Sequence, residues 1–151
     1  MPMTPARLCL LASLGAFTAA TGAVSVTSAP TSEAATSYRV RVTCTVPKGQ
    51  PERQLAPNSC LNYVPDGTQT YNAKVRNGRG NPVAGVWVQW TDSNTRDARF
   101  RPAQNPCKTN LRGVCSAELV DTNPRAGERI TVKATVGGSS AVGYLTFRSS
   151  N

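Results

Sequence analysis

From Thr36 onward the chain alternates apolar and polar residues with a period of two, and clusters of Gly, Pro, Asn and Asp interrupt the alternation at short intervals. Because successive side chains of a β-strand point to opposite faces, this alternation predicts strands with one buried face. No helical period of useful length occurs in this part of the sequence. Short strands separated by turns every ~8 to 12 residues are typical of a sandwich or small barrel. The sequence therefore predicts an all-β domain.

We predict eight strands, at Tyr38–Val46, Thr68–Arg76, Val83–Thr91, Ala98–Arg101, Cys107–Thr109, Val114–Asp121, Arg129–Val136 and Val142–Arg148. In the second of these, Tyr71, Ala73 and Val75 share the face that we expect to be buried. Val46 to Leu61 is predicted to be a loop, because it is rich in proline, which cannot donate to the hydrogen-bond ladder of a sheet.

Residues 1–35 are predicted to be a signal peptide. Arg7 supplies the positive start, the uncharged stretch from Leu8 to Val26 is rich in Leu, Ala, Gly and Thr, and cleavage is expected at Ala34 or Ala35. The many small residues make this stretch a weak membrane anchor, and no basic flank follows it. We therefore expect export, either into the extracellular space or to the cell surface, with no membrane span after cleavage.

Four cysteines remain in the exported part, namely Cys44, Cys60, Cys107 and Cys115. An even number of cysteines in an oxidising compartment favours disulfides, but four cysteines allow three connectivities that sequence alone does not separate. We expect the local pairs Cys44 with Cys60 and Cys107 with Cys115, because each closes a short loop, and a loop of ~15 residues gains roughly 3 kcal/mol. A zinc site is disfavoured, since the chain has no histidine and no C-x-x-C spacing.

The chain is strongly basic, with 17 Lys and Arg against 8 Asp and Glu, a formal net charge of +9. A basic exported protein is attracted to polyanions such as teichoic acids, acidic polysaccharides, extracellular DNA and anionic lipid surfaces. The same charge also fits an ordinary solvated surface, so it identifies no ligand.

Sequence motifs for catalysis are missing. The absence of histidine removes most nucleophile and base arrangements, and neither a glycine-rich phosphate loop nor a calcium loop occurs. The scattered acids leave open a carboxylate pair for glycoside hydrolysis, and Asp92 with Asp97 would form at most a weak calcium site among arginines. We expect no enzymatic activity, no metal and no cofactor.

Two tryptophans on one predicted strand face opposite ways. Trp90 shares a face with Val86 and Val88 and is predicted to lie in the core. Trp87 is then either an exposed indole, able to stack on a sugar ring or to anchor a partner, or is partly covered by a neighbouring loop.

Basic residues follow Trp87 in the sequence. Arg96, Arg99 and Arg101 are predicted to lie on an edge strand, and Lys108 and Arg112, in the hairpin between the last two cysteines, are candidates to join them in space. Together with Trp87 they form the candidate binding surface. The alternative role of such residues is to prevent edge-to-edge aggregation of sheets.

Three stretches resemble a known family. They are YNAKVRNGRGNPVAGVWVQW (Tyr71–Trp90), CKTNLRGVCSAEL (Cys107–Leu119) and AGERITVKATVGG (Ala126–Gly138). In order and spacing they resemble the bacterial immunoglobulin-like domain of group 1, repeated in invasin and intimin adhesins. The resemblance implies an immunoglobulin-like β-sandwich of about seven to nine antiparallel strands. The cysteines flanking the hairpin resemble disulfide-stapled, single-copy exported variants of that domain.

These observations lead to one domain, with residues 36–67 as an N-terminal strand and cysteine-closed loop and residues 68–148 as the immunoglobulin-like core. The leading hypothesis is a secreted, non-catalytic binding or adhesion module that contacts a cell-envelope polymer or an extracellular protein. The alternatives are a small cationic envelope-active protein, antimicrobial or inhibitory, and a purely structural surface protein. We expect a monomer that recognises no specific nucleic acid.

Overall fold

The computed structural model describes residues 37–46, 48 and 51–150, so the predicted signal peptide at 1–35 lies outside the described residues. The described part forms ten strands and one 3-10 turn, which are β1 (Tyr38–Thr45), β2 (Arg53–Ala56), β3 (Ser59–Val64), β4 (Thr68–Asn77), β5 (Trp87–Asp92), β6 (Ala98–Phe100), η1 (Pro102–Gln104), β7 (Cys107–Lys108), β8 (Val114–Asp121), β9 (Arg129–Val136) and β10 (Ser139–Ser149). Within these residues, no helix has the length and apolar character needed to cross a membrane.

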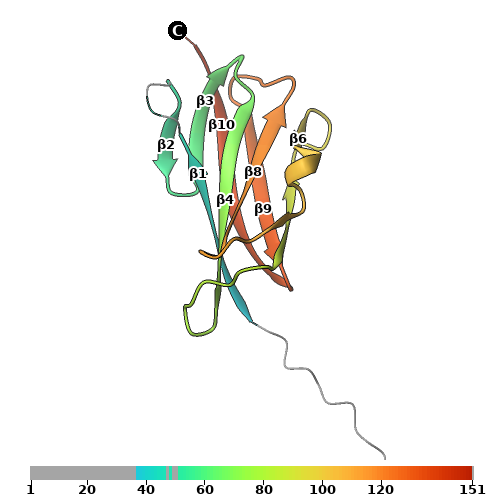
Figure 1. Ribbon diagram of the computed structural model, residues 1–151. Helices are drawn as coiled ribbons and strands as arrows, with labels where there is room; N and C mark the ends of the chain where they lie inside the picture. The colour runs from blue at the N-terminus through green and yellow to red at the C-terminus, as the bar shows by residue number, and fades with distance from the viewer. Residues whose placement is uncertain (1–36, 47, 49–50, 151) are drawn as a thin grey trace, which may run out of the picture. The chain divides into compact units, whose positions relative to one another are not determined.

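The strands form two packed sheets, one with the order β1-β4-β8-β6 and one with the order β2-β3-β10-β9-β5-β7. In Figure 1 the four-stranded sheet lies in front of the larger one. Taken in chain order, β1, β4, β5, β6, β8, β9 and β10 reproduce strands A to G of an immunoglobulin domain, because A-B-E-D forms one sheet there and G-F-C the other. The predicted immunoglobulin-like sandwich is therefore confirmed.

Strands β2, β3 and β7 are additions to this pattern. Strand β2 and the first half of β3 lie in the segment Val46 to Leu61, so our prediction that this segment is a loop is wrong over most of its second half. Pro51 and Pro57 stand just outside the strands, where a missing N–H breaks no ladder. Strand β3 also pairs in parallel with β10, whereas we expected antiparallel strands throughout.

The predicted strand at Val83–Thr91 begins later in the structure, at Trp87. Before it, Gly85 has a φ of 76° and donates its N–H to the Thr109 carbonyl oxygen at 2.8 Å. This left-handed conformation, which glycine adopts readily, turns the chain and delays the strand. The predicted bounds of β8 and β9 agree with the structure.

The core lies between the sheets and is centred on Trp90, which is 1% exposed. Its ring centroid lies 5.2 Å from that of Phe100 and 6.4 Å from that of Tyr71. Tyr71, Ala73 and Val75 are fully buried, which confirms the predicted inner face of β4. Alternation on β4 and β5 therefore fixes which side chains reach solvent.

Both disulfides cross-link the two sheets. Cys44 on β1 is bonded to Cys60 on β3, and Cys107 on β7 is bonded to Cys115 on β8, with Cα–Cα distances of 6.2 and 6.0 Å. This is the pairing that we predicted from loop length. Each bond ties one of the added strands to the four-stranded sheet.

Candidate binding surfaces

Trp87 is an exposed indole on the outer face of the six-stranded sheet. Its side chain is 59% exposed, whereas its neighbours Val88 and Trp90 are buried. Lys108 lies directly opposite Trp87 in the β5–β7 register, with its Nζ atom 5.6 Å from the ring centroid. A cation at this distance from an indole is attracted to the ring. The two residues form a compact apolar and cationic unit, which we call the Trp87 surface.

The backbone beneath the Trp87 surface is held at several points. The Asn105 side chain accepts a hydrogen bond from the Trp90 N–H and donates one to the Trp90 carbonyl oxygen, both at 2.9 Å. The indole N–H of Trp90 donates to the Cys107 sulfur at 3.2 Å. Because the Cys107 disulfide also anchors β7, the strand that carries Lys108 has a fixed position against β5.

The turn between β7 and β8 carries Arg112 and Leu111. The Asn110 side chain accepts hydrogen bonds from the N–H groups of Arg112 and Val114 at 2.9 and 3.1 Å, and Gly113 has a φ of 69°. These bonds shape a turn whose tip points into solvent, with Leu111 89% exposed. An exposed leucine at the tip of a rigid turn is available for contact with a partner.

Strand β6 is the predicted basic edge strand. It closes the four-stranded sheet, with Arg99 exposed between the buried side chains of Ala98 and Phe100. Arg101 forms an ion pair with Glu118 on β8, so its charge is partly neutralised. Arg96 is exposed in the loop before the strand.

The structure divides the predicted binding surface into two. Trp87 and Lys108 lie together on the outer face of the six-stranded sheet, whereas Arg99 projects from the outer face of the other sheet. Since the outer faces of a sandwich point away from each other, these residues do not form one continuous site.

A second basic surface was missed by sequence reasoning. Arg39 and Arg41 on β1 lie directly opposite Arg76 and Lys74 on β4, and all four side chains are exposed. We call these four residues the cationic block. They line a surface hollow of about 430 Å³ together with Val40. The alternation of apolar and polar residues in each strand predicts that these side chains point outward. Their proximity depends on the register between β1 and β4, which the sequence does not reveal.

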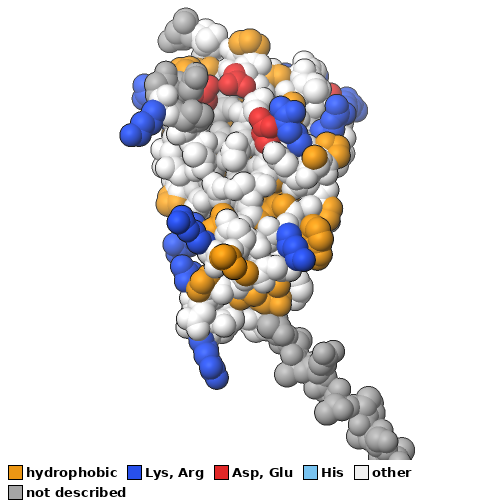
Figure 2. All heavy atoms as spheres, viewed as in Figure 1, with side chains coloured by type: hydrophobic (Ala, Val, Ile, Leu, Met, Phe, Trp, Pro, Cys, Tyr) orange, Lys and Arg blue, Asp and Glu red, His pale blue; other side chains and the backbone are white. Residues whose placement is uncertain are grey.

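A hollow near the opposite end of the same sheet face is lined by acidic residues. Glu52, Asp66 and Glu118, together with threonines and Gln69, line a hollow of about 240 Å³ there. Figure 2 shows basic side chains on the lower part of this face, and both acidic and basic side chains near its upper end. The acidic residues of the hollow therefore lie at the end away from the cationic block, with basic side chains beside them.

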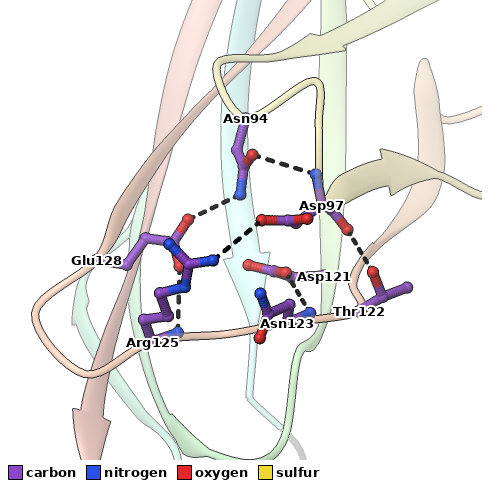
Figure 3. A network of polar contacts seen from close by, with 7 residues as sticks. All are labelled: Asn94, Asp97, Asp121, Thr122, Asn123, Arg125 and Glu128. Carbon is purple, nitrogen blue, oxygen red and sulfur yellow. Dashed lines mark hydrogen bonds and ion pairs between the residues drawn. The ribbon is translucent and has the colours of Figure 1, made fainter.

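Loops at one end of the sandwich form a polar network (Figure 3). Glu128 accepts hydrogen bonds from the Asn94 side chain at 2.7 Å and from the Arg125 N–H at 3.1 Å. The Thr122 hydroxyl donates to the Asp97 carbonyl oxygen at 3.0 Å. These contacts join the loop after β5 to the loop after β8.

Two aspartates near this network make fewer hydrogen bonds than buried carboxylates usually do. One oxygen of Asp92 and one of Asp121 are buried without a hydrogen-bond partner among the described residues. Burial raises the pKa of Asp92, an effect opposed by a hydrogen bond from the Asn94 backbone and strengthened by the charge of Asp121. In the part of the chain that the structure describes, no three His, Cys, Asp or Glu residues are grouped as a metal site would require.

No protein-family model matches the chain, and no curated protein matches it. Among solved structures, the chain is similar to domains 4 and 5 of the S-layer protein SbsC, with a TM-score of 0.49 and 10% identity over 75% of this chain and 54% of that one. It is also similar to the S-layer protein rSbsC(31-844), with a TM-score of 0.47 and 13% identity over 62% of this chain and 12% of that one. For domains 1-6 of SbsC the TM-score is 0.44, with 15% identity over 60% of this chain and 12% of that one. The chain spans between 12% and 54% of the length of these three structures.

Proposed function

We propose that this protein is an exported, non-catalytic binding module of the bacterial immunoglobulin-like kind. It acts at the cell surface or in the extracellular space, where it contacts an envelope polymer or another extracellular protein. The two disulfides support this assignment, since such bonds persist in oxidising compartments and are rare in the cytosol.

The observation that carries the proposal is the exposed indole of Trp87 beside Lys108 on a backbone that disulfide and side-chain contacts hold in place. Tryptophans are enriched among the residues that dominate binding energy, and they also stack on sugar rings. A fixed backbone reduces the entropy that is lost on binding. Stacking on a sugar or on an apolar partner residue therefore gives a role to an indole that no other part of the fold covers.

The first test is retention of the purified protein on insoluble cell-wall material as the salt concentration rises. Specific contacts through an apolar anchor survive physiological ionic strength, where the Debye length is about 8 Å and exposed charges are largely screened. We expect retention to persist at physiological salt. The Trp90→Ala variant, whose fold should be damaged, serves as the negative control.

The second candidate function is that of a small cationic protein acting on anionic envelopes, which the net charge of +9 favours. This alternative predicts strong binding at low salt that collapses near physiological salt. It also predicts equal loss of binding when any two exposed basic residues are neutralised. The same salt series therefore separates the two candidate functions.

A further inference from the structure

We propose that the cationic block of Arg39, Arg41, Lys74 and Arg76 binds a phosphodiester polymer that lacks bases, whose phosphates are joined by polyol or sugar units. The inference deepens the proposed binding function, on which it rests, by naming a partner class, and it concerns a surface separate from Trp87. The polymer lies along β1 and β4 on the outer face of the four-stranded sheet.

The register of the two strands arranges the four cations as two pairs. Arg39 lies opposite Arg76, and Arg41 lies opposite Lys74. Directly opposed residues of an antiparallel pair have Cβ atoms about 4.5–5.5 Å apart, close enough for both side chains to reach one anion. Successive outward residues of a strand are about 7 Å apart. The block therefore offers two anion positions at that spacing, which fits consecutive anions of a chain better than one small ion.

The charges of the block are uncompensated within the described residues. None of its four side chains forms an ion pair there, and Arg76 donates its one side-chain hydrogen bond to the Gly80 carbonyl oxygen. Like charges directly opposite each other on a sheet destabilise it. An anion held between the members of each pair replaces this repulsion by attraction, so anion binding and fold stability are coupled.

The side-chain types favour phosphate. Three of the four cations are arginines, whose planar guanidinium groups bind phosphate oxygens through two parallel hydrogen bonds. The fourth, Lys74, supplies a compact point charge. The hollow of about 430 Å³ lined by these residues gives room for a chain to lie on the sheet.

The neighbouring outward positions select against nucleic acid. Next to the block lie Thr43, Asn72 and Ser116, and the Ser116 hydroxyl donates to the Asn72 side chain at 2.6 Å. Among the described outward residues of β1 and β4 there is no aromatic ring on which a base could stack. Hydroxyl and amide groups instead match the hydroxyls of a polyol or sugar unit.

The acidic hollow on the same face limits where the polymer can lie. Glu52, Asp66 and Glu118 line the hollow beyond the polar residues. Arg101 compensates the charge of Glu118, and the charges of Glu52 and Asp66 repel phosphate. A bound chain is therefore confined to the basic half of the sheet.

The test uses fluorescently labelled poly(glycerol phosphate) as the probe and measures affinity by anisotropy at several salt concentrations. The variant Arg41→Gln/Lys74→Gln removes one cation pair, and the matched control Arg96→Gln/Arg99→Gln removes the same charge at the other edge of the sheet. We expect the block variant to lose about tenfold or more in affinity and to reduce the steepness of log K against log salt by about 0.7, since one neutralised phosphate is lost. The control should change affinity less than about threefold, the difference that long-range attraction alone would give.

Further measurements distinguish other possible ligands of the cationic block. Oligothymidylate should bind more weakly than the glycerol polymer, and equal or tighter binding would overturn the proposal in favour of nucleic acid. Equal losses in the two double variants, or no binding of the probe by the wild type, would also overturn it. If the wild type dimerises at low salt and the block variant stays monomeric, the cationic block binds the acidic residues of a second copy. That result would also overturn the proposal.

Two controls keep the result interpretable. Thermal melts should show that the block variant is at least as stable as the wild type, because it loses a repulsive pair. Trp87→Ala should retain poly(glycerol phosphate) binding, so failure at the Trp87 surface and failure at the cationic block are seen separately.

Discussion

At the scale of single residues, Trp87 and Trp90 show how position along one strand separates two roles. They lie three residues apart on β5, so one faces solvent and the other faces the core. Trp90 contacts the rings of Tyr71 and Phe100 on the facing four-stranded sheet, whereas Trp87 contacts Lys108 at the surface. Substitution of the two residues should therefore give opposite results.

Trp90→Ala should lower the free energy of unfolding by about 3 to 5 kcal/mol, because it leaves a large cavity beside Phe100 and Tyr71. That loss is a large part of the stability of a small domain. Urea unfolding followed by fluorescence of the remaining tryptophan measures it. A variant that unfolds at the wild-type urea concentration would show that the ring is not packed in the core.

Asp92 makes stability depend on pH. Burial, together with the charge of Asp121, raises the pKa of the folded Asp92 carboxyl above its ordinary value of about 3.9. The folded state therefore binds the proton more tightly than the unfolded state, and stability falls as the pH rises from about 4 through the folded pKa. Above that range the carboxylate is charged and its burial opposes folding.

Asp92→Asn should therefore melt at a higher temperature than the wild type at pH 7, and the difference should shrink as the pH approaches 3. Differential scanning calorimetry across this range measures both curves. The matched control is Asp66→Asn, an exposed aspartate that should show no comparable gain. A gain that persists undiminished at pH 3 would contradict the assignment to ionisation.

At the scale of elements, sequence reasoning succeeded where one face of a strand is solvated. The bounds of β8 and β9 could be predicted because their alternation is regular. It failed for β3, where Cys60, Leu61 and Asn62 are all buried, so both faces are covered and the alternation disappears. Besides β2, strand β3 pairs with β10, more than eighty residues later, and no local pattern reveals such a pairing.

The candidate binding surfaces could be predicted only in part for the same reason, because they depend on how distant strands pair. The exposure of Trp87 follows from its position in β5, but the pairing of Arg41 with Lys74 depends on the register between two strands. The separation of Trp87 from Arg99 depends on which sheet each strand joins. Neither register nor sheet membership could be predicted from the sequence.

The disulfide between β1 and β3 should stabilise the added hairpin. Cys44→Ser/Cys60→Ser opens a loop of sequence separation 16, which in the chain-entropy model costs about 3 kcal/mol of stability. In this variant we expect hydrogen exchange to accelerate more in β3 than in β9, because β3 lies beside the short edge strand β2, whereas β9 lies near the centre of the sheet. In the control Cys107→Ser/Cys115→Ser, exchange in β3 should stay slow relative to the rest of the fold. Equal exchange of β3 in all three proteins would contradict this role of the bond.

At the scale of the whole molecule, the charged groups and the exposed indole lie on different faces of one rigid sandwich. The four-stranded sheet carries the cationic block, with the acidic hollow near its other end, and the six-stranded sheet carries the Trp87 surface. Two disulfides join these sheets. Such a module can hold a charged polymer on one face while the other face stays free for a second contact.

The most direct test of the binding role compares Trp87→Ala with the wild type, by thermal melting and by affinity for cell-wall material at physiological salt. We expect a melting temperature close to that of the wild type and a loss of binding of more than about 2 kcal/mol, the range of an interface hot spot. Charge reversal at Arg99, the control, should act mainly on the association rate and its salt dependence. Unchanged binding of Trp87→Ala, or destabilisation as large as that of Trp90→Ala, would contradict the account.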